Sequence, residues 1–216
     1  MADSVIACPE IIVSESLEWG ALEETFREAP AIEFGQYWLE NMEPGFASGR
    51  VRMGWKEDRF LFFAELQDRE VVSEASERNQ ALWEMGDVLE MFAGVKNHPS
   101  YLEYHTAPNG QILQLLWPDA EALAAYRIQK NPKPYMIYDD LAVAHARLVN
   151  GGWQVYGEVP AASLPGAGVP LRGTKWEINF GRYDYARNGD LILSATSPLT
   201  QLLFHRRPEW REITFR

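Results

Sequence analysis

The chain has 216 residues, of which 46% are hydrophobic and 24% are charged, and these fractions are ordinary for a globular protein. Its formal net charge of -11 excludes a nucleic-acid partner, because phosphate binding depends on clustered lysine and arginine side chains. The single cysteine, Cys8, excludes an internal disulfide and any metal site built from several thiolates.

The apolar segments are all short. None approaches the roughly 20 residues that cross a bilayer, so we expect no membrane partner. The N-terminus has neither the basic start nor the continuous apolar core of a secretion signal. We therefore expect a soluble chain, for which the cytoplasm is the simplest location unless a leader was removed, and the compartment stays unknown.

The first part of the chain, residues 1–45, is a mixed N-terminal segment in which short apolar stretches alternate with glutamate-rich ones. The spacing of apolar residues over 16–26 is partly helical. From residue 51 onward the pattern changes to short apolar segments separated by turn signals. A β domain of this size commonly forms one unit, so we predict a single domain over residues 1–216.

The strands are predicted from alternation and from turns. Val51–Trp55 has an apolar side chain at every second position, and Arg59–Leu66 is apolar on both faces, as in a buried strand. Asn150-Gly151-Gly152 is the strongest hairpin signal, because glycine readily adopts a positive φ. The predicted strands span residues 51–55, 59–66, 87–92, 101–106, 111–117, 141–149, 153–159, 176–180, 191–194 and 212–215, with a short helix over 119–126.

Many short strands and little helix indicate an all-β fold. We predict an antiparallel two-sheet β-sandwich of immunoglobulin-like or jelly-roll type with minor helix. Trp55, Trp153 and Trp176 lie in alternating strand patterns, so we expect them in the core.

Five groups of residues occur in an informative order between about residues 49 and 215. They are Val51-Arg52-Met53-Gly54-Trp55 with Phe62-Phe63 and Gln67-Asp68; Leu82-Trp83-Glu84 with Gly86-Asp87-Val88-Leu89-Glu90-Met91-Phe92; Tyr101-Leu102-Glu103-Tyr104 with Pro108-Asn109-Gly110; Asn179-Phe180-Gly181-Arg182; and Ser197-Pro198 with Phe204-His205 and Pro208. Together they resemble family 9 carbohydrate-binding modules and the related DOMON-like sandwich domains.

The resemblance implies a non-catalytic protein whose partner is a mono- or oligosaccharide. Members of that family commonly stack a sugar between two tryptophans, because the C–H face of a pyranose fits an aromatic plane. Trp83 matches the first tryptophan and Glu90 matches an acid that bonds sugar hydroxyls. Glu103 and His105 stand where sugar-binding members offer an arginine and an asparagine. The family has its second tryptophan just before the Ser-Pro step, but in this chain the residues just before Ser197-Pro198 include no tryptophan.

Several residues have an alternative interpretation. Trp83 could instead pack beneath the loop over residues 70–81. Bound calcium is frequent in the family, and Asp68 and Asp87 are its candidate ligands, since hard cations prefer several oxygens. A structural role for Asp87, capping backbone amides, is favoured over calcium. His205 is predicted to fix the final turn by hydrogen bonding.

Two further functions stay open. Some DOMON-like domains hold haem through methionine and histidine, and this chain has six methionines and four histidines. The other alternative is an accessory part of a glycoside hydrolase system, since such modules are often attached to xylanases. Catalysis by the chain itself is not expected, because Asp87 and Glu90 are three residues apart and so lie on opposite faces of a regular strand.

Overall fold

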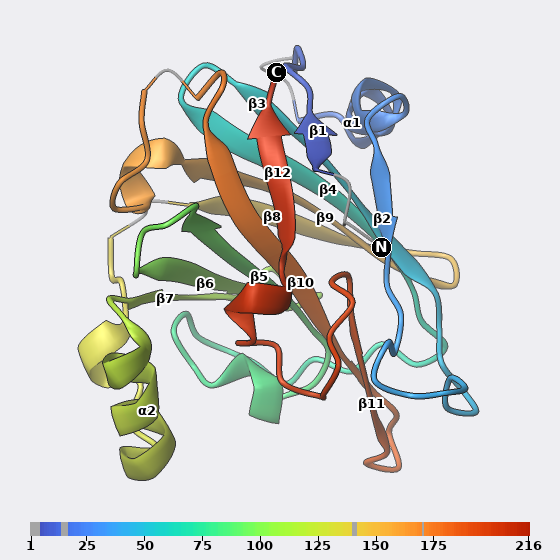
Figure 1. Cartoon of the computed structure of the whole chain (residues 1–216). Coiled ribbons are helices and arrows are strands. Elements are labelled where there is room, and N and C mark those ends of the chain that lie inside the picture. The colour runs from blue at the N-terminus through green and yellow to red at the C-terminus, as the bar shows by residue number, and fades with distance from the viewer. Residues whose placement is uncertain (1–4, 14–16, 140–141, 170) are drawn as a thin grey trace.

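The computed structural model describes residues 5–13, 17–139, 142–169 and 171–216, which form two β-sheets packed face to face (Figure 1). The predicted two-sheet sandwich with minor helix is confirmed. Two of the predicted element boundaries, Ser16 and Leu141, lie outside the described residues. In chain order the elements are β1 Ile6–Cys8, α1 Trp19–Phe26, β2 Ala31–Glu33, β3 Gly49–Lys56, β4 Arg59–Gln67, η1 Leu82–Glu84, β5 Val88–Val95, β6 Tyr101–Thr106, β7 Ile112–Trp117, α2 Ala120–Gln129, η2 Lys133–Tyr135, β8 Val143–Val149, β9 Gly152–Pro160, η3 Ala161–Ser163, β10 Lys175–Tyr185, β11 Leu191–Ala195, η4 Arg207–Glu209 and β12 Arg211–Phe215, where η marks a short 3-10 helix.

The larger sheet has the strand order β1-β12-β10-β5-β6-β7, and β11 also pairs with β10. Its pairs are antiparallel except for β1 and β12, which run parallel. The register sets Glu90 of β5 opposite His105 of β6, two residues beyond Glu103. Since side chains alternate along a strand, these three polar side chains emerge on one face of the sheet.

The smaller sheet has the order β2-β3-β4-β9-β8 and contains the predicted hairpin at Asn150-Gly151-Gly152, which joins β8 to β9. Gly151 adopts a φ of +80° in the turn between β8 and β9, as the sequence predicts. At the neighbouring Gly152 a Cβ atom would lie 2.0 Å from the backbone oxygen of Leu66, so this close approach of two chains requires glycine.

Aromatic side chains fill the space between the sheets. Phe62 of β4 meets Phe180 of β10 with ring centroids 5.4 Å apart, and Phe60 meets Trp176 at 5.8 Å. The prediction that Trp55, Trp153 and Trp176 belong to the core is confirmed, because all three side chains are buried.

The N-terminal segment adds a strand to each sheet. Ile6 of β1 lies opposite Ile213 of β12, and Ile32 of β2 lies opposite Val51 of β3. Both strands have only three residues, which is too short for an alternating pattern to appear in the sequence. Cys8 lies opposite Phe215 and is fully buried.

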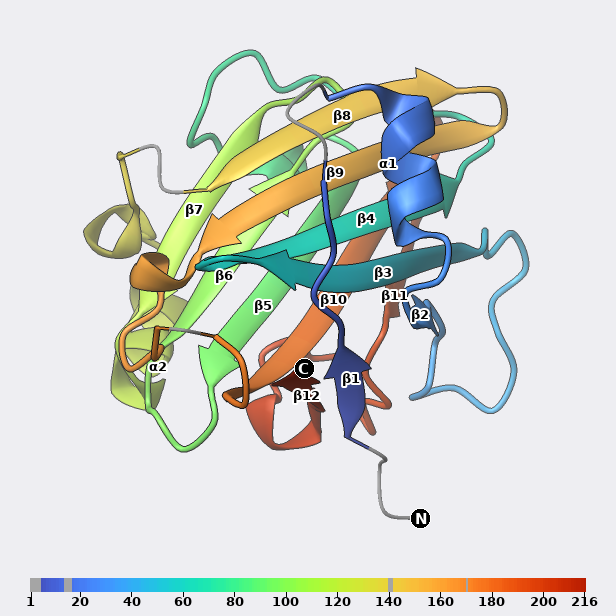
Figure 2. The same cartoon turned by 90° about the horizontal axis from the view of Figure 1, so that it is seen from above.

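The outer face of the smaller sheet is covered by α1 (Figure 2). Leu22 and Phe26 of this helix pack against Phe63 and Tyr156, and the rings of Phe26 and Phe63 stack at 5.7 Å.

Three segments cover part of the outer face of the larger sheet: η1 with its flanks, α2, and residues 199–210. They build a second apolar cluster on Val88 and Phe92 of β5 and Leu115 of β7. Helix α2 lies beside β7 (Figure 1) and begins where the Asp119 carboxylate accepts the N–H of Ala122 at 2.8 Å. Within the described residues, no helix combines the length and the apolar composition that crossing a bilayer requires.

Candidate functional site

A pocket of about 200 Å³ opens on the outer face of the larger sheet, between the three covering segments. Three of the four predicted ligand residues, Trp83, Glu90 and Glu103, line it. His105 is fully buried and lies behind the two carboxylates rather than on the pocket wall. The other lining residues are Leu115, Trp117, Tyr126, Tyr183, Leu193, Leu202, Leu203, Phe204 and His205.

Trp83 forms one wall of this pocket. It lies in η1, where its backbone oxygen accepts the hydroxyl of Tyr185 at 2.7 Å and its ring meets the ring of His105 edge-on at 5.6 Å. The side chain is half-buried, so part of the indole stays accessible. Trp83 also packs against the apolar cluster that includes Ala75 of the loop over residues 70–81, so a packing role and an accessible ring face are compatible.

Glu90 and Glu103 form the polar floor of the pocket, although only 3% and 5% of their surfaces are exposed. One Glu103 oxygen lies 2.7 Å from Nε2 of His105, and the other accepts the indole N–H of Trp117 at 2.5 Å. The same His105 nitrogen lies 3.4 Å from a Glu90 oxygen. One oxygen of each glutamate and a ring nitrogen of His105 lie within 4.8 Å of one another.

These neighbours push the two carboxyl groups toward different protonation states. Burial raises the pKa of Glu90 to about 8, with Glu103 adding to the effect and His105 opposing it. For Glu103 burial acts upward, but His205, His105 and the Trp117 N–H together hold its pKa below the ordinary value. Glu103 is therefore the ionised member of the pair at neutral pH, and Glu90 is the protonated one.

Both histidines near the floor are positioned by hydrogen bonds. Burial acts to lower the pKa of His105, but Glu90 and Glu103 outweigh it and raise that pKa. His205 lies with Nδ1 2.7 Å from the Tyr101 hydroxyl and Nε2 3.7 Å from Glu103. His205 thus makes a side-chain hydrogen bond, as a structural role requires, and it also lines the pocket.

The remaining aromatic lining was missed by sequence reasoning. Tyr183 lies beyond the predicted end of its strand at Phe180, because Gly181 interrupts the pattern. A Cβ atom at Gly181 would lie 2.6 Å from the Phe204 ring, so glycine leaves the space in which that ring packs on the sheet. Trp117 is the last residue of β7 and Tyr126 lies in α2, and the centroids of their rings are 5.1 Å apart. The alternation of side chains along β7 could have placed Trp117 on the same face of the sheet as Glu103. No local sequence pattern indicated that Tyr126 of α2 would line the pocket.

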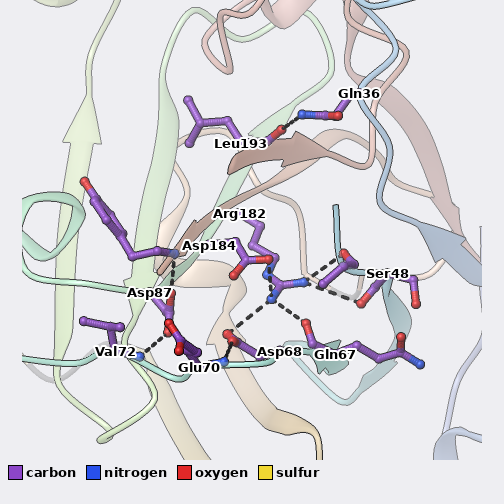
Figure 3. A network of polar contacts seen from close by, with 12 residues as sticks. Gln36, Ser48, Gln67, Asp68, Glu70, Val72, Asp87, Arg182, Asp184 and Leu193 are labelled. Atoms are coloured by element: carbon purple, nitrogen blue, oxygen red, sulfur yellow. Dashed lines mark hydrogen bonds and ion pairs between the residues drawn. The ribbon is translucent and has the colours of Figure 1, made fainter. Parts of the chain in front are cut away.

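The two predicted metal ligands lie elsewhere, in a polar network that joins the sheets (Figure 3). Asp87 accepts the N–H of Val72 at 2.6 Å and the N–H of Tyr185 at 2.7 Å. The guanidinium of Arg182 is buried and lies 3.3 Å from Asp68 and 3.1 Å from Asp184. The same guanidinium donates to the backbone oxygens of residues 47 and 67.

Oxygens of Asp68, Asp87 and Asp184 lie within 4.8 Å of one another, and such a group of oxygens has the chemistry that calcium prefers. Here, however, Arg182 provides the compensating positive charge, and both Asp87 oxygens accept backbone amides. Burial raises the pKa of Asp87 to about 7, although the two amide bonds oppose this shift. The contacts favour a structural role, and the calcium site stays a prediction.

Comparison with solved structures identifies the fold. The chain has the fold of family 9 carbohydrate-binding modules. It superimposes on such a module from Caldicellulosiruptor kristjanssonii, solved with cellotriose, with a TM-score of 0.66 and 12% identity over 99% of this chain and 94% of that one. The glucose complex of a family 9 module from that organism gives a TM-score of 0.64 and 12% identity over 97% and 95%.

A protein from Bacteroides uniformis, provisionally assigned as carbohydrate-binding, is similar over the full length of both chains. Its TM-score is 0.76 and its identity 13%. No protein-family model and no curated protein sequence matches the chain. At these identities the similarity extends to the fold, while the residues of the site have to be argued from this chain.

Proposed function

We propose that the protein binds carbohydrate without catalysing its conversion, and that the sugar occupies the pocket beside Trp83. The observation that carries this proposal is a half-buried indole forming the wall of a pocket whose floor holds Glu90 and Glu103. The fold is shared with modules that were solved with cellotriose and glucose.

The pocket offers both kinds of contact that a sugar ring needs. The C–H face of a pyranose gains dispersion energy and buries apolar area against an aromatic plane, here Trp83. Its hydroxyls need acceptors, which the Glu103 carboxylate and the carbonyl oxygen of protonated Glu90 provide. A volume of about 200 Å³ lies below the range of roughly 300–1,000 Å³ for drug-sized ligands, so it suits a single ring.

His105 has a supporting role in this proposal. Its ring nitrogen contacts both glutamates and holds them in place from behind. The family resemblance predicts a direct bond from His105 to a sugar hydroxyl, but this side chain has no exposed surface, so its effect on a ligand would pass through the two carboxylates.

Calorimetry with cellotriose tests the proposal. The wild-type protein is expected to bind, and Trp83→Ala is expected to weaken binding at least about fivefold, because an aromatic contact in a binding site contributes roughly 1–3 kcal/mol. Trp19→Ala is the matched control, since Trp19 is a half-buried tryptophan that packs against Phe63 on the outer face of the other sheet. Equal affinities for wild type and Trp83→Ala would refute the site.

The two acids require a second test, because sequence reasoning considered only Asp87 and Glu90 as a pair. The β5–β6 register instead brings Glu90 close to Glu103. A retaining glycosidase must present one carboxylate oxygen to the sugar carbon. Here both Glu103 oxygens are held by His105 and Trp117. We therefore expect no turnover of aryl glycosides, and measurable release of the aryl group that is lost in Glu103→Gln would contradict a purely binding role.

A further inference from the structure

The floor of the sugar pocket holds two carboxyl groups, those of Glu90 and Glu103. One His105 nitrogen lies 2.7 Å from Glu103 and 3.4 Å from Glu90, and Nε2 of His205 lies 3.7 Å from Glu103. Neither lysine nor arginine is among the described residues that line the pocket. Glu103 therefore has two imidazoles as neighbours, whereas Glu90 has only the imidazole that Glu103 already holds. A cation that enters the pocket would pair with Glu90 and favour its ionised form.

The two glutamates differ in how their oxygens are used. Glu103 has a partner at each oxygen, Trp117 at one and His105 at the other. Glu90 accepts no hydrogen bond from any of the described residues, and its nearest charged neighbour is the histidine already held by Glu103. Glu90 lines the pocket with 3% of its surface exposed. It is thus a buried acid, facing the ligand space, that lacks a donor of its own.

Aromatic and leucine side chains surround this acid. Trp83, Trp117, Tyr126, Tyr183 and Phe204 all line the same small pocket. Aromatic faces attract a cation through the ring quadrupole, most strongly when the cation is removed from water. Burial raises the pKa of Tyr126 and of Tyr183, and the negative charge of Glu90 and Glu103 adds to that effect. Both tyrosines therefore lie close enough to the two acids to interact with them electrostatically. The walls and the floor therefore favour the same type of ligand.

We propose that this pocket selects a sugar that carries a free, protonated amino group, with the ammonium held by Glu90 and Glu103 and the ring packed against Trp83. The proposal rests on the proposed carbohydrate binding and adds the chemical class of the ligand. An ammonium gives Glu90 the donors that it lacks, and its positive charge favours the ionised form of Glu90 over the protonated one. A neutral sugar provides only hydroxyl donors, and an N-acetylated one has lost the charge.

Three β-1,4-linked trisaccharides test this proposal, because they differ only in the group at C2 of each ring. Calorimetry would compare cellotriose, which has hydroxyls, with the trimer of glucosamine, which has ammonium groups, and the trimer of N-acetylglucosamine. Titrations at pH 6 and low salt keep the amines protonated. We expect the glucosamine trimer to bind the wild-type protein at least tenfold more tightly than either neutral trimer.

Two variants connect this preference to the site. Glu90→Gln keeps the shape of the side chain but removes its capacity for negative charge, and the affinity ratio between the amino and the neutral trimers should fall to about one. Glu121→Gln removes an exposed carboxylate on α2, outside the pocket lining, and should leave the ratio unaltered. If Glu90→Gln and Glu121→Gln lower the ratio equally, the preference reflects overall charge, and the proposal is overturned.

The possible failures can be told apart. If cellotriose binds and the glucosamine trimer binds no more tightly, the selection of an amino sugar is wrong while carbohydrate binding stands. If none of the three trisaccharides binds, carbohydrate binding at this site fails and the selection fails with it.

Discussion

Glu90 is the residue at which the proposed binding role and the stability of the fold make opposite demands. Its pKa rises from the ordinary value of 4.5 to about 8 in the folded protein, chiefly because of burial. A raised carboxyl pKa means that the folded state holds a proton that the unfolded chain releases. The folded state therefore loses stability as the pH rises from about 4.5 through about 8.

Replacing this glutamate should remove that pH dependence. We expect Glu90→Gln to stabilise the protein by about 2–4 kcal/mol at pH 8 relative to wild type, and by far less at pH 5. Urea unfolding of both proteins at the two pH values measures the difference. A stability difference between variant and wild type that is the same at pH 5 and pH 8 would show that the Glu90 pKa is not raised. Glu121→Gln, on an exposed helix surface, should change little at either pH.

At the scale of elements, Arg182 connects the two sheets. It lies in β10 of the larger sheet and contacts the end of β4 and the residues before β3, which belong to the smaller sheet. Its guanidinium is fully buried, donates to backbone oxygens of residues 47 and 67, and lies beside Asp68 and Asp184. Arg182→Leu leaves the Asp68 carboxylate buried without its partner, so we expect a loss of roughly 3–5 kcal/mol in the free energy of unfolding. Arg27→Leu, which removes an exposed ion pair with Glu24, should cost less than about 1 kcal/mol. Similar losses for the two variants in urea unfolding would contradict the structural role of Arg182.

The strands could be predicted where the chain itself marks them. β3, β4, β8 and β9 were found because alternating residues and turn signals are local features. The C-terminal half of β10 was not found, because Gly181 weakens the local pattern and its pairing with β5 and β11 compensates. The floor of the site depended on the β5–β6 register, which brings Glu90, Glu103 and His105 together and which no local pattern specifies.

At the scale of the whole molecule, the N-terminal strand closes one end of the larger sheet against the C-terminal strand. The two strands lie side by side (Figure 1), and Cys8 is buried where they pair. The sequence predicted the sandwich but missed this closure, because it joins two segments at opposite ends of the chain.

Cys8 gives a direct measure of that closure. Burial raises the pKa of its thiol, and the thiolate is the form that reacts with a disulfide reagent. We expect the native protein to react with Ellman's reagent roughly 100-fold more slowly than the protein in urea. Equally fast reaction in both conditions would mean that β1 is detached from β12 in solution.

The most direct measurement of the central claim is a crystal structure of the protein soaked with cellotriose. The account predicts one sugar ring packed against the indole of Trp83, with hydroxyls hydrogen-bonded to Glu90 and Glu103. A trisaccharide bound on another surface, with the pocket beside Trp83 free of sugar, would contradict it.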